Sequence, residues 1–225
     1  MNRSCFWAGV RAEFPLLVGV FPFGLIYGVL AIEAGLSLAE AQSMSWMVFA
    51  GSSQFLAAQL VHGAVPGMVI VLTIAIVNLR HMLYSASLAP YLKKLSPGWK
   101  LLLAYLLTDE AYAVTVRHYE ETGDHSLSHW FFLGAGLALW STWQISTGLG
   151  IAVGEILPAN WPLDFALPLT FIAIVVPMLK RWPFVAAALS AGTVAVLAVG
   201  LPYNTGLLVA AIVGIMVGLI LEKGE

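Results

Sequence analysis

Residues 66–90 read PGMVIVLTIAIVNLRHMLYSASLAP, a long apolar stretch with Asn78, Arg80 and His81 near its middle. A helix needs about 20 mostly apolar residues to cross the hydrocarbon core of a membrane. The stretch has that length between its two prolines. We therefore predict that it spans a membrane and holds its three polar side chains at mid-depth.

The composition extends this conclusion to the whole chain. Of its 225 residues 60% are hydrophobic and 10% are charged, and the mean hydropathy is +0.89. A soluble domain is typically about 45–50% apolar and about 25% charged, so a soluble globule of this composition would expose large apolar patches. The composition therefore argues against a soluble enzyme. The net charge of −2 gives no basic arm for nucleic acid, and the single cysteine, Cys5, cannot form an internal disulfide.

Seven further apolar stretches indicate an all-α membrane protein. They are residues 14–36, 39–61, 99–117, 130–157, 163–179, 184–200 and 207–221. Their apolar runs are continuous, whereas the strands of a membrane β-barrel alternate apolar and polar residues. We predict one transmembrane domain over residues 1–225, embedded in the lipid bilayer, with seven or eight spanning helices, some of them discontinuous. We interpret the start, MNRSCFWAGVRAEF, as a flank of the first span rather than a removed signal peptide.

Two of these stretches have polar or small residues in their middle. Residues 39–61 contain FAGSSQF, and the segment either spans the membrane or re-enters it; the distribution of Lys and Arg does not decide. Residues 130–157 contain STWQIST, so this helix is expected to be tilted or broken.

A faint internal similarity raises the question of an inverted repeat, a common feature of secondary transporters. APYLKK at residues 89–94 resembles VPMLKR at residues 176–181, and GSSQF and STWQI precede them at similar distances. Chance similarity is the competing explanation, and the sequence alone favours it.

Asp109 and Glu110 are the strongest indication of function, because they lie at the centre of an apolar stretch. A charged side chain at this depth costs at least about 2.5–3.5 kcal/mol on insertion scales, and such residues are usually functional. We expect one of the two to bind a substrate ammonium group or to carry a coupling proton; the sequence does not show which one faces a cavity. Tyr105 and Tyr112 lie on the helix face of Asp109 and are expected to donate hydrogen bonds to it. The alternative is a structural ion pair with Arg80.

Asn78, Arg80 and His81 form a second candidate site. The planar fork of arginine matches a carboxylate, so Arg80 and Asn78 are candidates for binding the carboxylate of an amino acid. If the helix breaks near Asn78, Arg80 would instead lie at the membrane interface. His81 is a candidate proton carrier because imidazole titrates near neutral pH, although a lone histidine is more often structural.

A third candidate site is the small and polar segment Gly51, Ser52, Ser53 and Gln54. A local unwinding here would expose backbone groups, and the half-helix that follows would direct its positive N-terminus at a carboxylate. The alternative is close packing by glycine and serine, with Gln54 hydrogen-bonded across a helix interface. Gln144 has the same two interpretations.

No pattern indicates an enzyme, a metal site or a cofactor. The histidines and carboxylates lack metal-ligand spacing, and no Walker loop, GxSxG or HExxH motif occurs. We therefore expect neither enzymatic activity nor a cofactor. The motifs Gly24/Gly28, Gly150/Gly154 and Gly214/Gly218 indicate close helix packing, either within the chain or against a partner.

The chain resembles the AzlC family, the large subunit of branched-chain amino acid exporters. The resemblance rests on GVFPFGLIYGVLAIEAGLS (19–37), FAGSSQF (49–55), NLRHMLYSASLAPYL (78–92), LLTDEAYAV (106–114), LDFALPLTFIAIVVPMLKRW (163–182) and VAAIVGIMVGLILE (209–222). The strings occur in unbroken order, and the resemblance extends over nearly the whole chain. The family usually has alanine where this chain has Ser52, a departure that bears on fine substrate preference.

The resemblance implies a multi-pass permease of the bacterial inner (plasma) membrane that exports valine, leucine, isoleucine and often methionine. It also implies a small membrane partner subunit of the AzlD type. Together with the candidate residues, it points to a secondary transporter coupled to an ion or to protons. The alternative is an ion channel or ion-conducting membrane subunit lined by the same polar residues.

Overall fold

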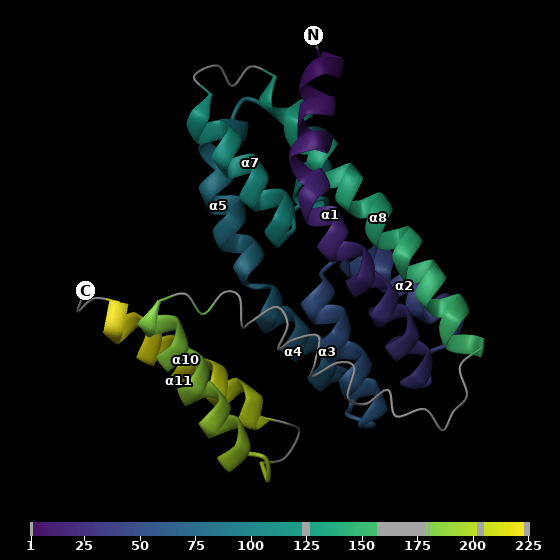
Figure 1. Cartoon of the computed structure of the whole chain (residues 1–225), viewed down its shortest axis with the longest axis vertical. Helices are drawn as coiled ribbons and strands as arrows, with labels where there is room; N and C mark the ends of the chain where they lie inside the picture. Colours follow the sequence, from purple (N-terminus) through teal and green to yellow (C-terminus); the bar gives the residue numbers. More distant parts are fainter. Residues whose placement is uncertain (1, 123–126, 157–178, 180, 202–204, 223–225) are drawn as a thin grey trace. The chain divides into compact units, whose positions relative to one another are not determined.

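The computed structural model describes residues 2–122, 127–156, 179, 181–201 and 205–222 (Figure 1). Every regular element among these residues is an α-helix, which confirms the all-α prediction. The chain forms two compact units, Met1–Trp161 and Pro162–Glu225. That the two make up one membrane domain stays a prediction.

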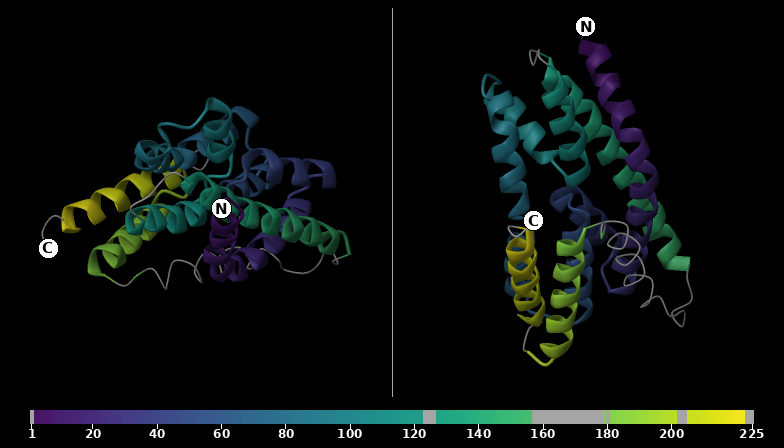
Figure 2. Two further views of the ribbon diagram at one scale, coloured as in Figure 1. Left: turned by 90° about the horizontal axis from the view of Figure 1, so that it is seen from above. Right: turned by 60° about the vertical axis from the view of Figure 1, so that its left-hand side comes forward.

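Two long helices, α1 (Asn2–Glu33) and α8 (Ser128–Ile156), form the frame of the first unit. They lie side by side and run in the same direction, as Figures 1 and 2 show. Residues 2–14, which were interpreted as a flank of the first span, belong to the same continuous helix α1. Residues 3–33 are long and apolar enough to cross a membrane.

Glycines bring α1 and α8 into close contact. Gly9 meets the backbone of Phe131 and the later Gly28 meets that of Thr147, which sets the parallel direction. A Cβ atom at Gly28 or at Gly150 would collide with the backbone of the facing helix. Two of the small-residue motifs therefore pack against each other within this chain.

Helices α2 (Leu38–Val48) and α3 (Gly51–His62) form a hairpin inside residues 39–61. The chain leaves the helix between them, where Phe49 has φ 40° and Ala50 is extended. Both arms contact Tyr27 of α1, since its hydroxyl donates to the carbonyl of Ala41 and its ring packs edge-on against Phe55. Each arm is only about 16–18 Å long at 1.5 Å per residue, half of what a span needs. The segment therefore has the form of a re-entrant hairpin rather than a span.

Helices α4 (Gly67–Asn78) and α5 (Arg80–Leu92) follow each other almost without interruption. Leu79 between them keeps helical dihedral angles, φ −55° and ψ −26°. Together they form a stretch of 26 residues that is long and apolar enough to cross a membrane. The interruption between the two helices is therefore short and lies next to Asn78, as one alternative predicted. It falls in the middle of the 26-residue stretch and not at its end, where the membrane interface would be.

Helices α6 (Pro97–Tyr105) and α7 (Asp109–Glu121) form a second hairpin. The start of α6 and the end of α7 both lie beside the start of α8: the rings of Trp99 and His129 are 4.9 Å apart, and those of His118 and Phe131 are 3.8 Å apart. The prediction of a single span over residues 99–117 is wrong. The reason is the turn before Thr108, whose side chain caps α7 and starts a new helix.

The two hairpins enter the first unit from opposite ends. The first begins directly after the end of α1, and the second begins beside the start of α8, which is parallel to α1. In Figure 1 the labels of α2, α3 and α4 lie along one half of α1 and α8, and those of α5 and α7 along the other half. The tips of the hairpins therefore meet near the middle of the unit.

The second unit contains α10 (Trp182–Leu197) and α11 (Thr205–Glu222). Gly214 of α11 lies against Ala187 and Ala191 of α10, so the third small-residue motif also packs within the chain. Near the ends of the pair, Arg181 and Glu222 lie 3.6 Å apart. The predicted span over residues 163–179 falls outside the described residues, apart from Leu179.

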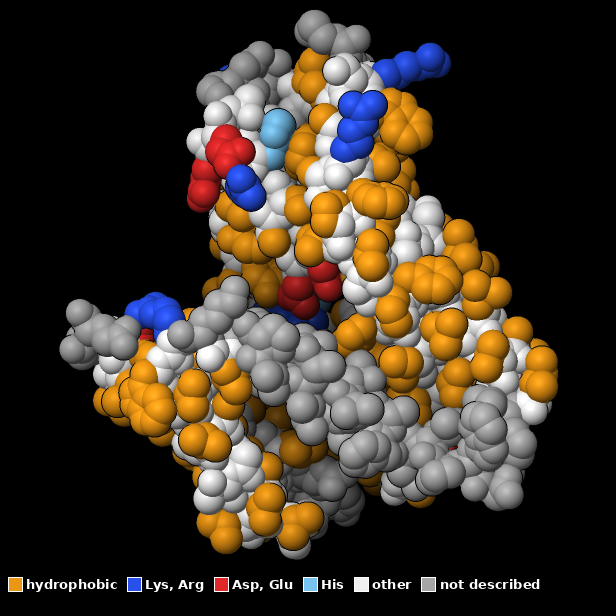
Figure 3. All heavy atoms as spheres, in the orientation of Figure 1, with side chains coloured by type: hydrophobic (Ala, Val, Ile, Leu, Met, Phe, Trp, Pro, Cys, Tyr) orange, Lys and Arg blue, Asp and Glu red, His pale blue; other side chains and the backbone are white. Residues whose placement is uncertain are grey.

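Among the described residues, three stretches are long and apolar enough to cross a membrane: 3–33, 67–92 and 205–222; α10 is a shorter apolar helix. Apolar side chains are widespread over the described surface in Figure 3 and charged side chains are few, as expected for a protein surrounded by lipid. The described residues therefore do not confirm the prediction of seven or eight spanning helices. Two of the stretches counted as candidate spans are the hairpins.

The helix that carries STWQIST is not broken. α8 runs from Ser128 to Ile156 without interruption, whereas GSSQF begins α3 directly after a break. An inverted repeat would require these two strings to occupy equivalent positions. They do not. Most of VPMLKR lies outside the described residues.

Candidate functional site

Three helix interruptions of the first unit meet at one place. They are the turn before α3, the break at Leu79 and the turn before α7. The side chains that link them are Ser52, Ser53, Asn78, Arg80 and Asp109, here called the Arg80 cluster. The sequence predicted these five from three separate apolar stretches, and the structure brings them into contact.

Arg80 is the centre of this cluster. Its Nη1 lies 3.1 Å from Oδ2 of Asp109, and its Nη2 donates to Oγ of Ser52 at 2.7 Å. Its buried Nε has no hydrogen-bond partner among the described residues. The ion pair with Asp109, which was the structural alternative, is therefore present; it occupies only part of the guanidinium group.

The two helix N-termini at the cluster differ in how they are capped. Ala50 precedes α3 and supplies no side-chain cap for the first backbone N–H groups of this helix. Thr108 caps α7 by accepting from the N–H of Ala111, and Asp109 stands in its first turn. An uncapped helix start carries a partial positive charge and attracts anions.

Asn78 completes the cluster by linking α4 to the first hairpin. Its Oδ1 accepts a hydrogen bond from Oγ of Ser53 at 2.6 Å. His81 lies beside it, with Nδ1 3.2 Å from the carbonyl oxygen of Asn78 and its ring edge-on to Tyr84. His81 thus neighbours the Arg80 cluster, and its role as a proton carrier stays a prediction.

Tyr84 holds Asp109 in place and was missed by the sequence analysis. Its hydroxyl donates to Oδ1 of Asp109 at 2.7 Å, and its ring stacks on Tyr112 at 4.4 Å. The prediction that Tyr105 and Tyr112 donate to Asp109 is wrong, because their hydroxyls donate to Trp46 and to Ser87. The spacing of Tyr84, one helical turn after Arg80, was the available signal.

Gln54 and Gln144 do not join the cluster. Oε1 of Gln54 accepts from Nε1 of Trp143 at 3.1 Å in the interior. Gln144 accepts from Nε2 of Gln42 at 2.8 Å and donates to the carbonyl of Ser45. Their contacts fit the alternative interpretation, hydrogen bonding across helix interfaces.

Gly51 is the first residue of α3 and lies against Trp143. A Cβ atom there would lie 2.9 Å from the ring of Trp143. The structure shows no ion pair between Glu110 and Arg80 among the described residues. Asp109 is thus the member of the acidic pair that contacts Arg80.

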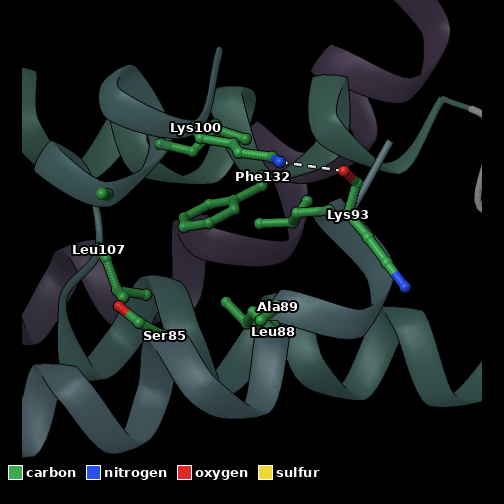
Figure 4. Close-up of a pocket in the computed structure, with 10 residues that line it drawn as sticks. Ser85, Leu88, Ala89, Lys93, Lys100, Leu107 and Phe132 are labelled. Atoms are coloured by element: carbon green, nitrogen blue, oxygen red, sulfur yellow. Dashed lines mark hydrogen bonds between the residues drawn. The ribbon is translucent and has the colours of Figure 1, made fainter. Parts of the chain in front are cut away.

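An apolar cavity of about 360 Å³ lies next along α5 and α6 (Figure 4). Its lining consists of Ser85, Leu88, Ala89, Leu92, Lys93, Lys100, Leu103, Ala104, Leu107 and Phe132. One end of the cavity is lined by Ser85, the residue after Tyr84 in α5, and by Leu107, which lies in the turn between α6 and α7. At the other end Nζ of Lys100 donates to the carbonyl of Lys93 at 3.0 Å.

The region that holds the Arg80 cluster is similar in sequence to known proteins. The sequence profile of the AzlC protein family matches residues 15–157, which include all of the cluster. An uncharacterized membrane protein of Archaeoglobus fulgidus is 32% identical over 86% of this chain and 84% of its own length. The inner membrane protein YgaZ of Escherichia coli is 26% identical over 80% and 76%. The branched-chain amino acid transport protein AzlC of Bacillus subtilis is 28% identical over 80% and 71%.

No solved structure matches the chain. The sequence relationships are sufficient, because the profile covers more than half of the chain and each relative is covered over most of its length. These relatives are named membrane or transport proteins, in agreement with the apolar helices found here. The chain is a membrane protein and belongs to the AzlC family.

Proposed function

We propose that the chain is the large subunit of a secondary transporter that exports valine, leucine and isoleucine, with methionine as a further substrate. It works in the bacterial inner membrane with a small membrane partner subunit of the AzlD type, and export is coupled to protons or another ion. The Bacillus subtilis relative is named a branched-chain amino acid transport protein, which supports the substrate class. The polar cluster between discontinuous helices supports the transporter class.

One observation carries the proposal: Arg80 joins an open helix N-terminus to a carboxylate within the apolar first unit. An amino acid has one carboxylate and one ammonium group. The substrate carboxylate binds Arg80, Ser52 and the free N–H groups at the start of α3. The ammonium group binds Asp109, which Tyr84 holds in position.

Both protein charges keep a partner in this arrangement. Without substrate, Arg80 and Asp109 neutralise each other at 3.1 Å. A zwitterion replaces that single ion pair with two, one at each of its ends. No charge is left unpaired in a low-dielectric site, where an unpaired charge is costly.

The apolar cavity beside the cluster accepts the aliphatic side chain. Apart from Ser85, Lys93 and Lys100, its lining residues are apolar. Such a pocket discriminates only about 1–3 kcal/mol per methylene. We therefore expect several branched-chain amino acids to share the site.

Counterflow of labelled isoleucine in proteoliposomes tests this proposal, with the chain alone and with its small partner subunit. A carrier shows saturable exchange, whereas a channel shows neither saturation nor counterflow. Arg80→Gln should abolish exchange. Arg117→Gln is the matched control, because Arg117 pairs with Glu121 on the exposed end of α7. Exchange that survives Arg80→Gln would overturn the assigned binding site, and unsaturable flux without counterflow would establish the channel.

A further inference from the structure

The turn between α5 and α6 carries three lysines, here called the lysine rim. Lys93 and Lys94 directly follow α5, Lys100 lies in the first turn of α6, and all three are exposed. Among the described residues no carboxylate lies within ion-pair distance of their ammonium groups. Three like charges without a counter-charge attract an anion.

The lysine rim lies at the depth of the lipid headgroups. It begins directly after residue 92, the last residue of the stretch 67–92 that is long and apolar enough to cross a membrane. Trp99, next to Lys100, packs edge-on against His129 and Trp130 at the start of α8. Tryptophan is enriched at the boundary between hydrocarbon and headgroups. The phosphate groups of membrane lipids lie at this depth.

The charges of the first unit also indicate the leaflet. Six of its seven Lys and Arg residues lie in the half where α1 and α8 begin, and the seventh, Arg80, lies in mid-span. The opposite ends of these two helices carry Glu33 and Glu155 instead. Cytoplasmic segments of membrane proteins carry an excess of Lys and Arg, and anionic lipids make the cytoplasmic leaflet negative. The rim therefore faces a negatively charged lipid surface.

The apolar cavity between α5 and α6 leads from this rim into the hydrocarbon region (Figure 4). Its edges include three small exposed residues, Ser85, Ala89 and Ala104, so the cavity is an open groove. Its floor consists of buried apolar residues: Leu88, Leu103, Leu107 and Phe132. From Ser85 to Lys93 the groove follows α5 for about 12 Å at 1.5 Å per residue. Because α5 belongs to a membrane-spanning stretch, the groove runs in the direction of the acyl chains.

The groove is larger than one substrate side chain requires. An apolar cavity of about 150 Å³ holds benzene, which is larger than the side chain of valine, leucine or isoleucine. The present cavity has about 360 Å³. A branched side chain at the Ser85 end therefore leaves the lysine end free for another apolar group.

We propose that the lysine rim and the adjoining end of the groove bind an anionic phospholipid. Its phosphate lies on the ammonium groups of the rim, and the first part of one acyl chain lies in the groove. A zwitterionic lipid binds less well, because its own ammonium group neutralises the phosphate. The bound lipid holds together α5 and α6, the helices that lead to Arg80 and to Asp109. The proposal does not depend on which substrate is transported.

Native mass spectrometry of the purified full-length protein, titrated with phosphatidylglycerol or phosphatidylcholine, tests the site. The wild type should bind one phosphatidylglycerol with at least about tenfold preference. A lysine near an anionic lipid contributes about fivefold in affinity. The triple variant Lys93→Gln, Lys94→Gln and Lys100→Gln should therefore bind at least about tenfold more weakly.

The matched control removes the same number of charges from the same half of the unit. The triple variant Arg3→Gln, Arg11→Gln and Arg117→Gln changes exposed residues that do not line the groove. Its affinity for phosphatidylglycerol should stay within about twofold of the wild-type value. An equal loss in the two triple variants would mean that the lipid is attracted by overall charge, and the proposal would fail.

The groove is tested with all charges in place, which keeps the proposal falsifiable if the lysine variant does not fold. Ala89→Leu fills the groove and should weaken phosphatidylglycerol binding about fivefold. Ala86→Leu, on an exposed position of α5 outside the groove, should leave binding unchanged. Inorganic phosphate, the same anion without acyl chains, should not displace the lipid at equal concentration. Displacement by phosphate, or unchanged lipid binding in Ala89→Leu, would show that the rim takes a free anion and would overturn the lipid site.

Discussion

The two hairpins have the same form and opposite chemistry at their tips. The tip of α2 and α3 exposes an uncapped helix N-terminus with Ser52 and Ser53, whereas the tip of α6 and α7 is capped by Thr108 and carries Asp109 and Glu110. One tip is built to receive a negative charge and the other to supply it. Arg80 contacts both tips, and the zwitterion site that we propose depends on this difference between them.

Removing the charge from the acidic tip should have the largest effect. Asp109→Asn leaves Arg80 without its ion-pair partner and the substrate ammonium group without a carboxylate. Losing one member of a hydrogen-bonded charge pair costs about 2–5 kcal/mol, so the KM for isoleucine counterflow should rise about 30-fold or more. A KM within threefold of the wild-type value, at pH values from about 5 to 8, would remove Asp109 from the site.

The receiving tip should respond less strongly. Ser52→Ala removes one hydrogen bond to the guanidinium group, worth about 1.5 kcal/mol when one partner is charged. We expect the KM to rise about tenfold, with a change in the relative rates for valine, leucine and isoleucine. Equal kinetics for all three substrates in the variant and the wild type would show that Ser52 only packs.

Capping the open helix should make the two tips more alike. In Ala50→Ser the new hydroxyl can accept from the backbone N–H of Ser53, which occupies a donor meant for the substrate carboxylate. A neutral hydrogen bond is worth about 1 kcal/mol, so affinity should fall about fivefold while thermal stability rises. Isoleucine binding to the detergent-solubilised protein measures the first effect and thermal unfolding the second. Tighter binding would contradict the idea of an open anion site.

Uncapping the acidic tip should change stability and leave substrate affinity nearly unaltered. Thr108→Ala removes the bond from the N–H of Ala111, and the loss of a helix cap costs about 1 kcal/mol. For a protein of this size the melting temperature should fall by about 2–4 °C. A fall in affinity larger than that in Ala50→Ser would mean that Thr108 also shapes the binding site.

The smallest effect should come from the start of the first hairpin. Hydrogen bonds from the side chain and backbone of Ser37 hold the pKa of Glu40 below its ordinary value of 4.5. A carboxyl group with a lowered pKa stabilises the fold above its unfolded pKa and loses that contribution as pH falls through the folded pKa. Melting temperatures at about pH 6 and pH 3.5 should therefore differ slightly less in Glu40→Gln than in the wild type. An identical difference in the two proteins would show that the hydrogen bonds between Ser37 and Glu40 do not contribute to the stability of the fold.

Much of this site could be predicted from single stretches of sequence. Charged residues in apolar surroundings are costly, so Arg80 and Asp109 stood out without any structure. Tyr84 is an ordinary membrane aromatic until the fold brings it 2.7 Å from Asp109.

The sequence by itself determined the class of protein, because apolar content and run length follow directly from the thickness of a bilayer. It also determined which polar residues needed an explanation. Only the tertiary structure decided that two of the predicted spans turn back. A turn such as Phe49–Ala50 or Leu106–Thr108 leaves little trace in an apolar sequence and is stabilised by contacts with distant residues. It also decided which residues meet: Arg80 with Asp109 and with Ser52 are pairs joined by packing between different helices.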